Sequence, residues 1–166
     1  GTPTRSGFDG FVFGEVKGQS LVYNISEPIY APTWFPCDDD PSDKALLDIK
    51  ITNDSQFVSV SNGNLIDVIN NGTKKTYHYK TVYPISTYLV AVYSAPYKTF
   101  YDLYKGLDGN DSMKIEYYVM PEHFEDSKVD FADHLDMMKT LSEIFGEYPF
   151  IKEKYGVAEF LWNYGA

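Results

Sequence analysis

The sequence predicts a mainly β protein, in which an antiparallel, sandwich-like β region is followed by the first strand–helix–strand part of an α/β region. Runs of β-branched and aromatic residues recur over roughly the first 110 residues, and short turn signals separate them. Near residue 121 the spacing of apolar residues changes to that of a helix. Hydrophobic residues make up 43% of the 166-residue chain, which is enough to bury a core and excludes a disordered chain.

Three dipeptides that tolerate a positive φ predict tight turns between strands. They are Asn62-Gly63, Asn71-Gly72 and Asp108-Gly109. The predicted strands around these turns cover residues 46–51, 57–60, 75–80 and 87–93. Residues 57–60 and 75–80 alternate with a period of two, as half-buried strands do. An antiparallel sheet or sandwich is therefore expected.

A helix is predicted over residues 127–145, after one more strand at 113–120. Apolar residues three or four apart form one helical face, and they are Phe131, Leu135, Met138, Leu141 and Phe145. Ser127 followed by Asp130 resembles a capping box, and Gly146 stands where a helix end favours a positive φ. A final strand is expected over residues 155–162.

Charge narrows the possible partners. The chain has 14 Lys and Arg against 24 Asp and Glu, which gives a formal net charge of −10. Nucleic acid is not an expected partner, because its phosphates would be repelled and no basic stripe is present. A substrate with a cationic amino end would be tolerated or steered inward. No stretch approaches the ~20 apolar residues that span a bilayer, so no membrane span is expected in this segment. The compartment is left open, cytoplasmic or extracytoplasmic.

The residues that usually carry catalysis or bind metals form no recognisable pattern here. The single cysteine, Cys37, has no partner for an internal disulfide. The three histidines, at positions 78, 123 and 134, lack the spacing of a helical metal pair. The acidic run 38–43 lacks the sixth-position glycine and twelfth-position glutamate of a calcium loop. Physical reasoning alone therefore predicts a soluble β-rich domain with a helical extension, with no catalytic residue and no metal ligand.

Four segments, in order, resemble the aminopeptidase N family of zinc peptidases. The first is residues 34–45, WFPCDDDPSDKA, which is similar to the family signature Phe-Pro-Cys-x-Asp-Glu-Pro-x-x-Lys-Ala. Residues 60–63 and 84–91 supply the next two matches. The fourth is the approach to the exopeptidase loop Gly-Ala-Met-Glu-Asn, whose first two residues would be Gly165 and Ala166. The chain departs from the family at Pro32, where Arg is frequent, and at Asp40, where Glu is frequent.

The resemblance implies that the parent protein is a zinc aminopeptidase that removes N-terminal residues from peptides. Residues 1–111 would be part of its N-terminal β domain, and residues 112–166 the start of a thermolysin-like catalytic domain. The chain would end before the His-Glu-x-x-His motif, so the zinc ligands would lie beyond residue 166. The chain by itself is therefore expected to be inactive and free of metal.

The resemblance also assigns substrate-binding residues. A Gln or Glu seven positions before Trp34 binds the substrate's free amino group in the family, and that position is Glu27. Gly165 and Ala166 would present backbone groups along a strand edge to which a peptide can add. The expected partner is a peptide with a free N-terminus. The alternative is a β-sandwich interaction module, or a non-catalytic relative used as a scaffold.

Overall fold

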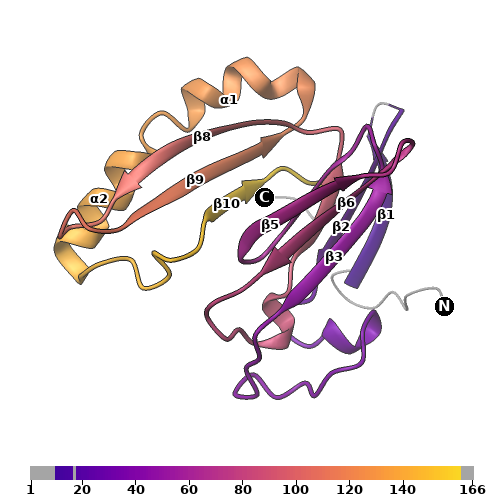
Figure 1. Ribbon diagram of the computed structural model, residues 1–166, viewed down its shortest axis with the longest axis horizontal. Helices are drawn as coiled ribbons and strands as arrows, with labels where there is room; N and C mark the ends of the chain where they lie inside the picture. Colours follow the sequence, from indigo (N-terminus) through magenta and orange to yellow (C-terminus); the bar gives the residue numbers. More distant parts are fainter. Residues whose placement is uncertain (1–9, 17, 162–166) are drawn as a thin grey trace. The chain divides into compact units, whose positions relative to one another are not determined.

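The computed structural model describes residues 10–16 and 18–161, and the chain divides into two compact units (Figure 1). Unit 1 is Gly1–Pro96 together with Phe160–Ala166, and unit 2 is Tyr97–Glu159. The boundary predicted at residue 111 lies in the turn of a hairpin inside unit 2. The compact units separate earlier, between Pro96 and Tyr97.

Unit 1 consists of two antiparallel sheets. Four strands, in the order β1-β2-β7-β4, form the first sheet: β1 (Gly10–Val16), β2 (Gln19–Ile25), β7 (Val92–Ala95) and β4 (Val58–Ser61). Three strands, in the order β3-β6-β5, form the second sheet: β3 (Asp48–Asp54), β6 (Lys74–Lys80) and β5 (Asn64–Asn70). Every strand pair within these sheets is antiparallel, as the sequence predicts.

Strand β6 shows how the two sheets are joined. Tyr77 and Tyr79 are buried, whereas the alternate residue His78 faces the other way and pairs with Asp48 at 2.6 Å. The two tyrosine hydroxyls donate to backbone carbonyls at Phe57 (3.2 Å) and Ser59 (3.0 Å), in and before β4 of the other sheet. The period of two along β6 directs both tyrosine side chains toward the other sheet. Their hydroxyl groups reach that sheet and join the two layers of the sandwich.

The three predicted turns have different roles. Gly72 and Gly109 have φ values of 77° and 73° and lie in the β5–β6 and β8–β9 hairpins. Gly63, with φ 79°, instead connects β4 to β5, which belong to different sheets. A Cβ at Gly63 would lie 2.2 Å from the carbonyl oxygen of Lys80, so the close approach of two backbones requires glycine there.

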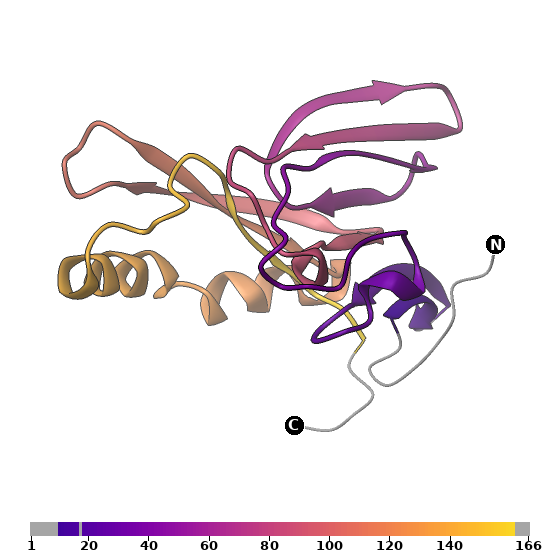
Figure 2. The same ribbon diagram turned by 90° about the horizontal axis from the view of Figure 1, so that it is seen from below.

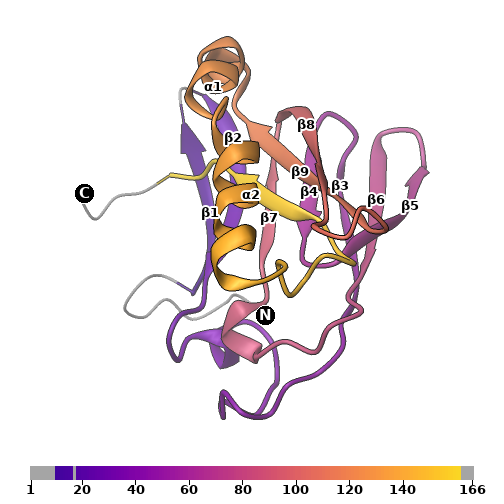
Figure 3. The same cartoon turned by 90° about the vertical axis from the view of Figure 1, so that its left-hand side faces the viewer.

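Unit 2 is a three-stranded sheet with helices on one face (Figures 2 and 3). Strand β9 (Ser112–Val119) lies between antiparallel β8 (Lys98–Lys105) and parallel β10 (Tyr155–Ala158). The helices are α1 (Phe124–Asp130) and α2 (His134–Phe145). The buried part of the core comes from the strands and the segment before β10, namely Tyr104, Met113, Ile115, Tyr117 and Ile151. Helical and inter-helical residues pack on it, namely Phe131, Leu135 and Met138.

The prediction of one continuous helix over residues 127–145 is wrong. The helix is interrupted at residues 131–133, where the ring of Phe131 stacks on that of Tyr117 with centroids 5.1 Å apart. Ser127 is no N-cap, because it lies inside α1 and its hydroxyl donates to the carbonyl of His123. Gly146 does end α2 as predicted, with φ 97° and its N–H bonded to the carbonyl of Ser142.

Two predicted strands are also shorter than expected. Residues 87–89 form a 3-10 turn, η2 (Thr87–Leu89), and only Val92–Ala95 pairs as a strand. The last strand ends at Ala158. Among the described residues, no helix is both long enough and apolar enough to cross a membrane.

Candidate functional site

Glu27 lies in a tight turn that directly follows strand β2. The strand ends at Ile25, and residues 27–30 form the turn, which the Tyr30 N–H closes by donating to the carbonyl of Ser26 at 2.8 Å. The 3-10 turn η1 (Ala31–Thr33) then leads to Trp34. The seven-residue spacing between Glu27 and Trp34 thus spans two consecutive turns.

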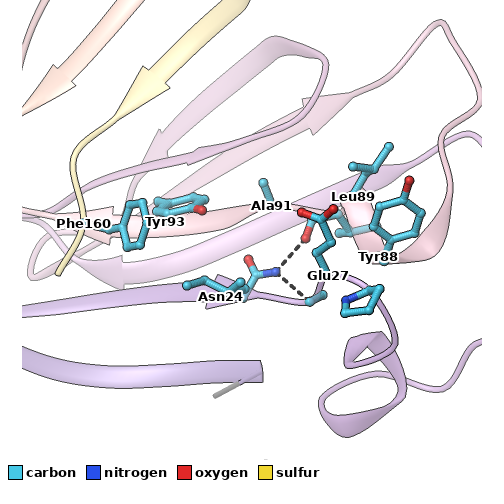
Figure 4. A pocket seen from close by; sticks show the side chains of 11 residues that line it. Asn24, Glu27, Tyr88, Leu89, Ala91, Tyr93 and Phe160 are labelled. Atoms are coloured by element: carbon cyan, nitrogen blue, oxygen red, sulfur yellow. Dashed lines mark hydrogen bonds between the residues drawn. The ribbon is translucent and has the colours of Figure 1, made fainter. Parts of the chain in front are cut away.

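A pocket of about 460 Å³ lies beside this turn within unit 1 (Figure 4). Two segments, 24–28 and 88–91, supply most of its lining, together with Tyr93 and Phe160. Figure 4 shows Glu27 at one end of the pocket, near Tyr88 and Leu89. Tyr93 and Phe160 form the other end, with ring centroids 5.9 Å apart.

The electrostatics of the pocket centre on Glu27. Of the described residues that line it, only Glu27 carries a formal charge. Burial, reinforced by the neighbouring Tyr23 hydroxyl, raises the pKa of Tyr93, so that phenol stays neutral. A mainly apolar pocket with one exposed carboxylate at its end can bind a small group that carries a positive charge.

The residues just before Glu27 in the chain, Asn24 and Ser26, form a buried hydrogen-bond network. Asn24 is 3% exposed and Ser26 is 2% exposed. The Asn24 amide donates to the Ser26 hydroxyl oxygen (2.9 Å) and to the carbonyl of Val90 (2.7 Å). Its side-chain oxygen accepts from the N–H of Val92 at 2.6 Å. The network therefore joins the strand before Glu27 to residues 90–92, the neighbouring segment that leads into β7.

The three predicted binding residues have different outcomes. Glu27 lines the pocket. Gly165 and Ala166 lie outside the described residues. No sequence signal indicates that Tyr88 and Phe160 line the same pocket, because they come from segments far apart in the chain, and the family match over residues 84–91 assigns no binding role to Tyr88.

The described residues do not fit a zinc site. Among residues 10–16 and 18–161, no three His, Cys, Asp or Glu side chains are grouped so that they could hold a metal ion. His78 pairs with Asp48, and His123 pairs with Glu159 at 2.7 Å. The His134 ring packs on the rings of Tyr117 and Phe131. Each histidine thus has different neighbours, and none of the three belongs to a group of metal ligands among the described residues.

Comparison with known families decides the membership of the chain. The family model described as the Peptidase M1 N-terminal domain matches residues 6–89, half of the chain. This chain belongs to the M1 peptidase family. The resemblance to the aminopeptidase N family drawn from residues 34–45 and the later segments is thereby confirmed.

Relatives of this M1 chain include both peptidases and a transcription factor. Endoplasmic reticulum aminopeptidase 1 of Mus musculus is 32% identical over 149 residues, which cover 85% of this chain and 15% of that protein. The crystal structure of a two-domain M1 zinc metallopeptidase bound to L-arginine is 25% identical, with a TM-score of 0.71 over 95% of this chain and 36% of that one. Transcription initiation factor TFIID subunit 2 of Gallus gallus is 32% identical over 73 residues, 43% of this chain and 6% of that protein. The M1 chain thus spans well under half the length of each.

Proposed function

We propose that this chain is the N-terminal portion of a zinc aminopeptidase, and that it supplies the carboxylate that binds the free amino group of a peptide substrate. The observation that carries the proposal is the position of Glu27, as the one charged side chain among the described residues that line a largely apolar pocket. Membership of the M1 family and the aminopeptidase relatives support it. The crystal structure bound to L-arginine adds a relative that binds a free amino acid.

The chemistry expected of Glu27 is recognition of the substrate, with no part in bond cleavage. An α-ammonium that lies beside a carboxylate gains charge-assisted hydrogen bonds of about 1.5–3 kcal/mol. Such a contact favours a substrate whose first residue has a free amine, because the positive charge must reach the end of the pocket. We assign the zinc to a part of the full-length protein outside this chain, since the described residues form no metal site.

In the full-length protein, Glu27→Ala should lower kcat/KM on substrates with a free amino terminus by about 10- to 100-fold. Glu27→Gln should be less harmful, because an amide oxygen still accepts a hydrogen bond. Glu15→Ala is the matched control, since it removes the same charge from an exposed position on β1 that does not line the pocket. Zinc content should be the same in all variants.

The decisive comparison uses one substrate with its amine free and the same substrate with its amine acetylated. Glu27→Ala should affect the free amine more strongly, because acetylation removes the charge that the carboxylate recognises. If Glu27→Ala slows both substrates equally, or neither, the assignment of Glu27 is wrong. Purified residues 1–166 should neither hydrolyse an aminoacyl substrate nor bind stoichiometric zinc.

A second candidate function is a non-catalytic scaffold, and the similarity to TFIID subunit 2 favours it. The two functions predict different residues after this segment in the full-length protein. Met-Glu directly after Ala166, then His-Glu-x-x-His and a later Glu, would support the peptidase. A full-length protein that lacks these residues and contains no zinc would support the scaffold. The proposed start of the catalytic domain at residue 112, and the contact of Gly165 and Ala166 with a peptide, depend on the first outcome.

A further inference from the structure

Glu27 has no support of its own at the end of the pocket. Within the part of the chain that the structure describes, no hydrogen bond or ion pair holds its carboxylate, and the residue is exposed. A free glutamate side chain samples many rotamers, so the region that it can reach depends on where the backbone of its turn is held. The groups that hold this turn therefore decide whether the carboxylate faces the pocket.

Ser26, the residue before Glu27, is held from two directions. Its hydroxyl oxygen accepts one hydrogen bond from the Asn24 amide and another from the indole N–H of Trp34, both at 2.9 Å. These two bonds occupy both lone pairs of the oxygen. The carbonyl of Ser26 also accepts the bond from Tyr30 that closes the turn. Both ends of the turn that carries Glu27 are thus tied to one buried serine.

The Asn24 amide extends this anchor to the neighbouring segment of the pocket lining. Its bonds to the carbonyl of Val90 and the N–H of Val92 fix the distance between β2 and the entry to β7. Because Val90 itself lines the pocket, one network holds both the Glu27 turn and a second segment of the pocket lining. Buried polar networks of this kind are rigid when every member is satisfied, and removing one member leaves its partners unpaired.

We propose that Ser26, together with Asn24 and Trp34, forms a set of positioning residues that aims Glu27 at the amino group of the substrate. This inference rests on the proposed function of Glu27 and adds the groups through which it works. None of the three needs to touch substrate through its hydrogen-bonding atoms. A displacement of about 1 Å at a substrate-positioning group is enough to lower turnover by as much as 100-fold.

The test uses three single variants of the full-length protein. Ser26→Ala removes the shared acceptor, and Trp34→Phe removes one donor while keeping a ring that can contact Phe11 and Phe35. Ser59→Ala is the matched control. It also deletes a fully buried hydroxyl of the same unit, one bonded to Ser94 at 2.8 Å, and Ser59 does not line the pocket.

We expect Ser26→Ala to lower kcat/KM on free-amine substrates by about 3- to 30-fold, and Trp34→Phe by less. Ser59→Ala should leave it within about twofold of the wild-type value. Adding Ser26→Ala to Glu27→Ala should cause no further loss, because a positioning residue has nothing left to position. A merely structural role for Ser26 would lower activity equally in the presence and absence of Glu27.

A second measurement does not depend on activity. Exchange of the Tyr30 amide reports the hydrogen bond that closes the turn, and it should become faster in Ser26→Ala and Trp34→Phe but not in Ser59→Ala. Unchanged exchange at Tyr30, or full additivity with Glu27→Ala, would overturn the positioning role. If Glu27→Ala alone has no effect, the proposed function fails instead, and the exchange result still decides whether Ser26 and Trp34 hold the turn.

Discussion

The two units of the chain bury their cores in different ways. Unit 1 places polar groups between its sheets and pairs them, as with Ser59 and Ser94, or with the Tyr79 hydroxyl on the carbonyl of Ser59. Unit 2 buries stacked rings, where Tyr117 lies 4.4 Å from Phe100 and 5.1 Å from Phe131 by ring centroids. The difference teaches that directional hydrogen bonds add to apolar burial between the sheets of unit 1, whereas stacked rings dominate the core of unit 2.

The candidate site lies in unit 1, and this location has a physical reason. In our proposal the Glu27 carboxylate meets a substrate amine, and such a contact needs a defined position more than it needs buried area. The Asn24 and Ser26 network provides defined directions, because hydrogen bonds are directional and apolar contacts are not.

The largest expected effect tests the stacked core. Tyr117→Ala should lower the free energy of unfolding of unit 2 by about 3–5 kcal/mol, because it removes a fully buried ring between two others. Urea unfolding followed by helical circular dichroism measures this, since both described α-helices lie in unit 2. Amide exchange in β4 and β6 of unit 1 is the control. A matching loss of protection there would show that the two cores unfold as one.

The next largest expected effect tests the hydrogen-bonded polar groups between the sheets of unit 1. Tyr79→Phe should destabilise unit 1 by about 1–3 kcal/mol, because the carbonyl of Ser59 loses the hydroxyl that donates to it while the ring stays. Tyr117→Phe is the matched change in unit 2, where the hydroxyl makes a longer bond to Asp102 at 3.2 Å. Tyr117→Phe should cost less than Tyr79→Phe in thermal or urea unfolding. The reverse order would remove the distinction between the two cores.

A smaller effect depends on pH and tests the hydrogen-bonded carboxylate Glu147, a polar contact of unit 2 that resembles those of unit 1. Burial by itself would raise the pKa of Glu147, but hydrogen bonds from the Leu107 N–H (2.6 Å), the Tyr104 hydroxyl and the Tyr148 N–H bring it below the usual value. A lowered folded-state pKa stabilises unit 2 above the unfolded pKa, and this stability is lost as the pH falls through the folded value.

The contribution of the Glu147 hydrogen bonds to stability is measured by following the urea midpoint of unit 2 from neutral pH to below pH ~4. Wild type should lose stability over this range, whereas Glu147→Gln should start lower and change less. Glu143→Gln is the control, because Glu143 is an exposed carboxylate on α2 that accepts none of the three hydrogen bonds made to Glu147 and lies 4.0 Å from Lys139. Identical pH profiles for wild type and Glu147→Gln would show that the Glu147 hydrogen bonds contribute nothing to the stability of unit 2.

The smallest expected effect concerns the end of α2, where Phe145 does not pack on the core of unit 2. Phe145 is 81% exposed, although the sequence places it on the same helical face as Leu135. Phe145→Ser should change the free energy of unfolding by no more than about 0.5 kcal/mol, whereas Leu135→Ala should cost about 2 kcal/mol or more. Equal losses in urea unfolding would mean that Phe145 is packed as well.

Much of the fold could be predicted from local sequence, because the interactions that decide it are local. Alternation along residues 75–80 predicts which tyrosines turn inward, since successive side chains of any strand point to opposite faces. Gly72, Gly109 and Gly146 have the positive φ that their positions require. The motif around residues 34–45 identifies the family, and through it Glu27.

Only the tertiary structure decided the rest, because those features depend on residues far apart in the sequence. The break in the helix at residues 131–133 accompanies stacking of Phe131 on Tyr117, and no helical period reveals that contact. Pairing of Asn24 with Val90 and Val92 joins positions more than 60 residues apart, so no motif predicts it. The sequence thus determined which residue recognises the amine in our proposal, and the fold decided what holds it in place.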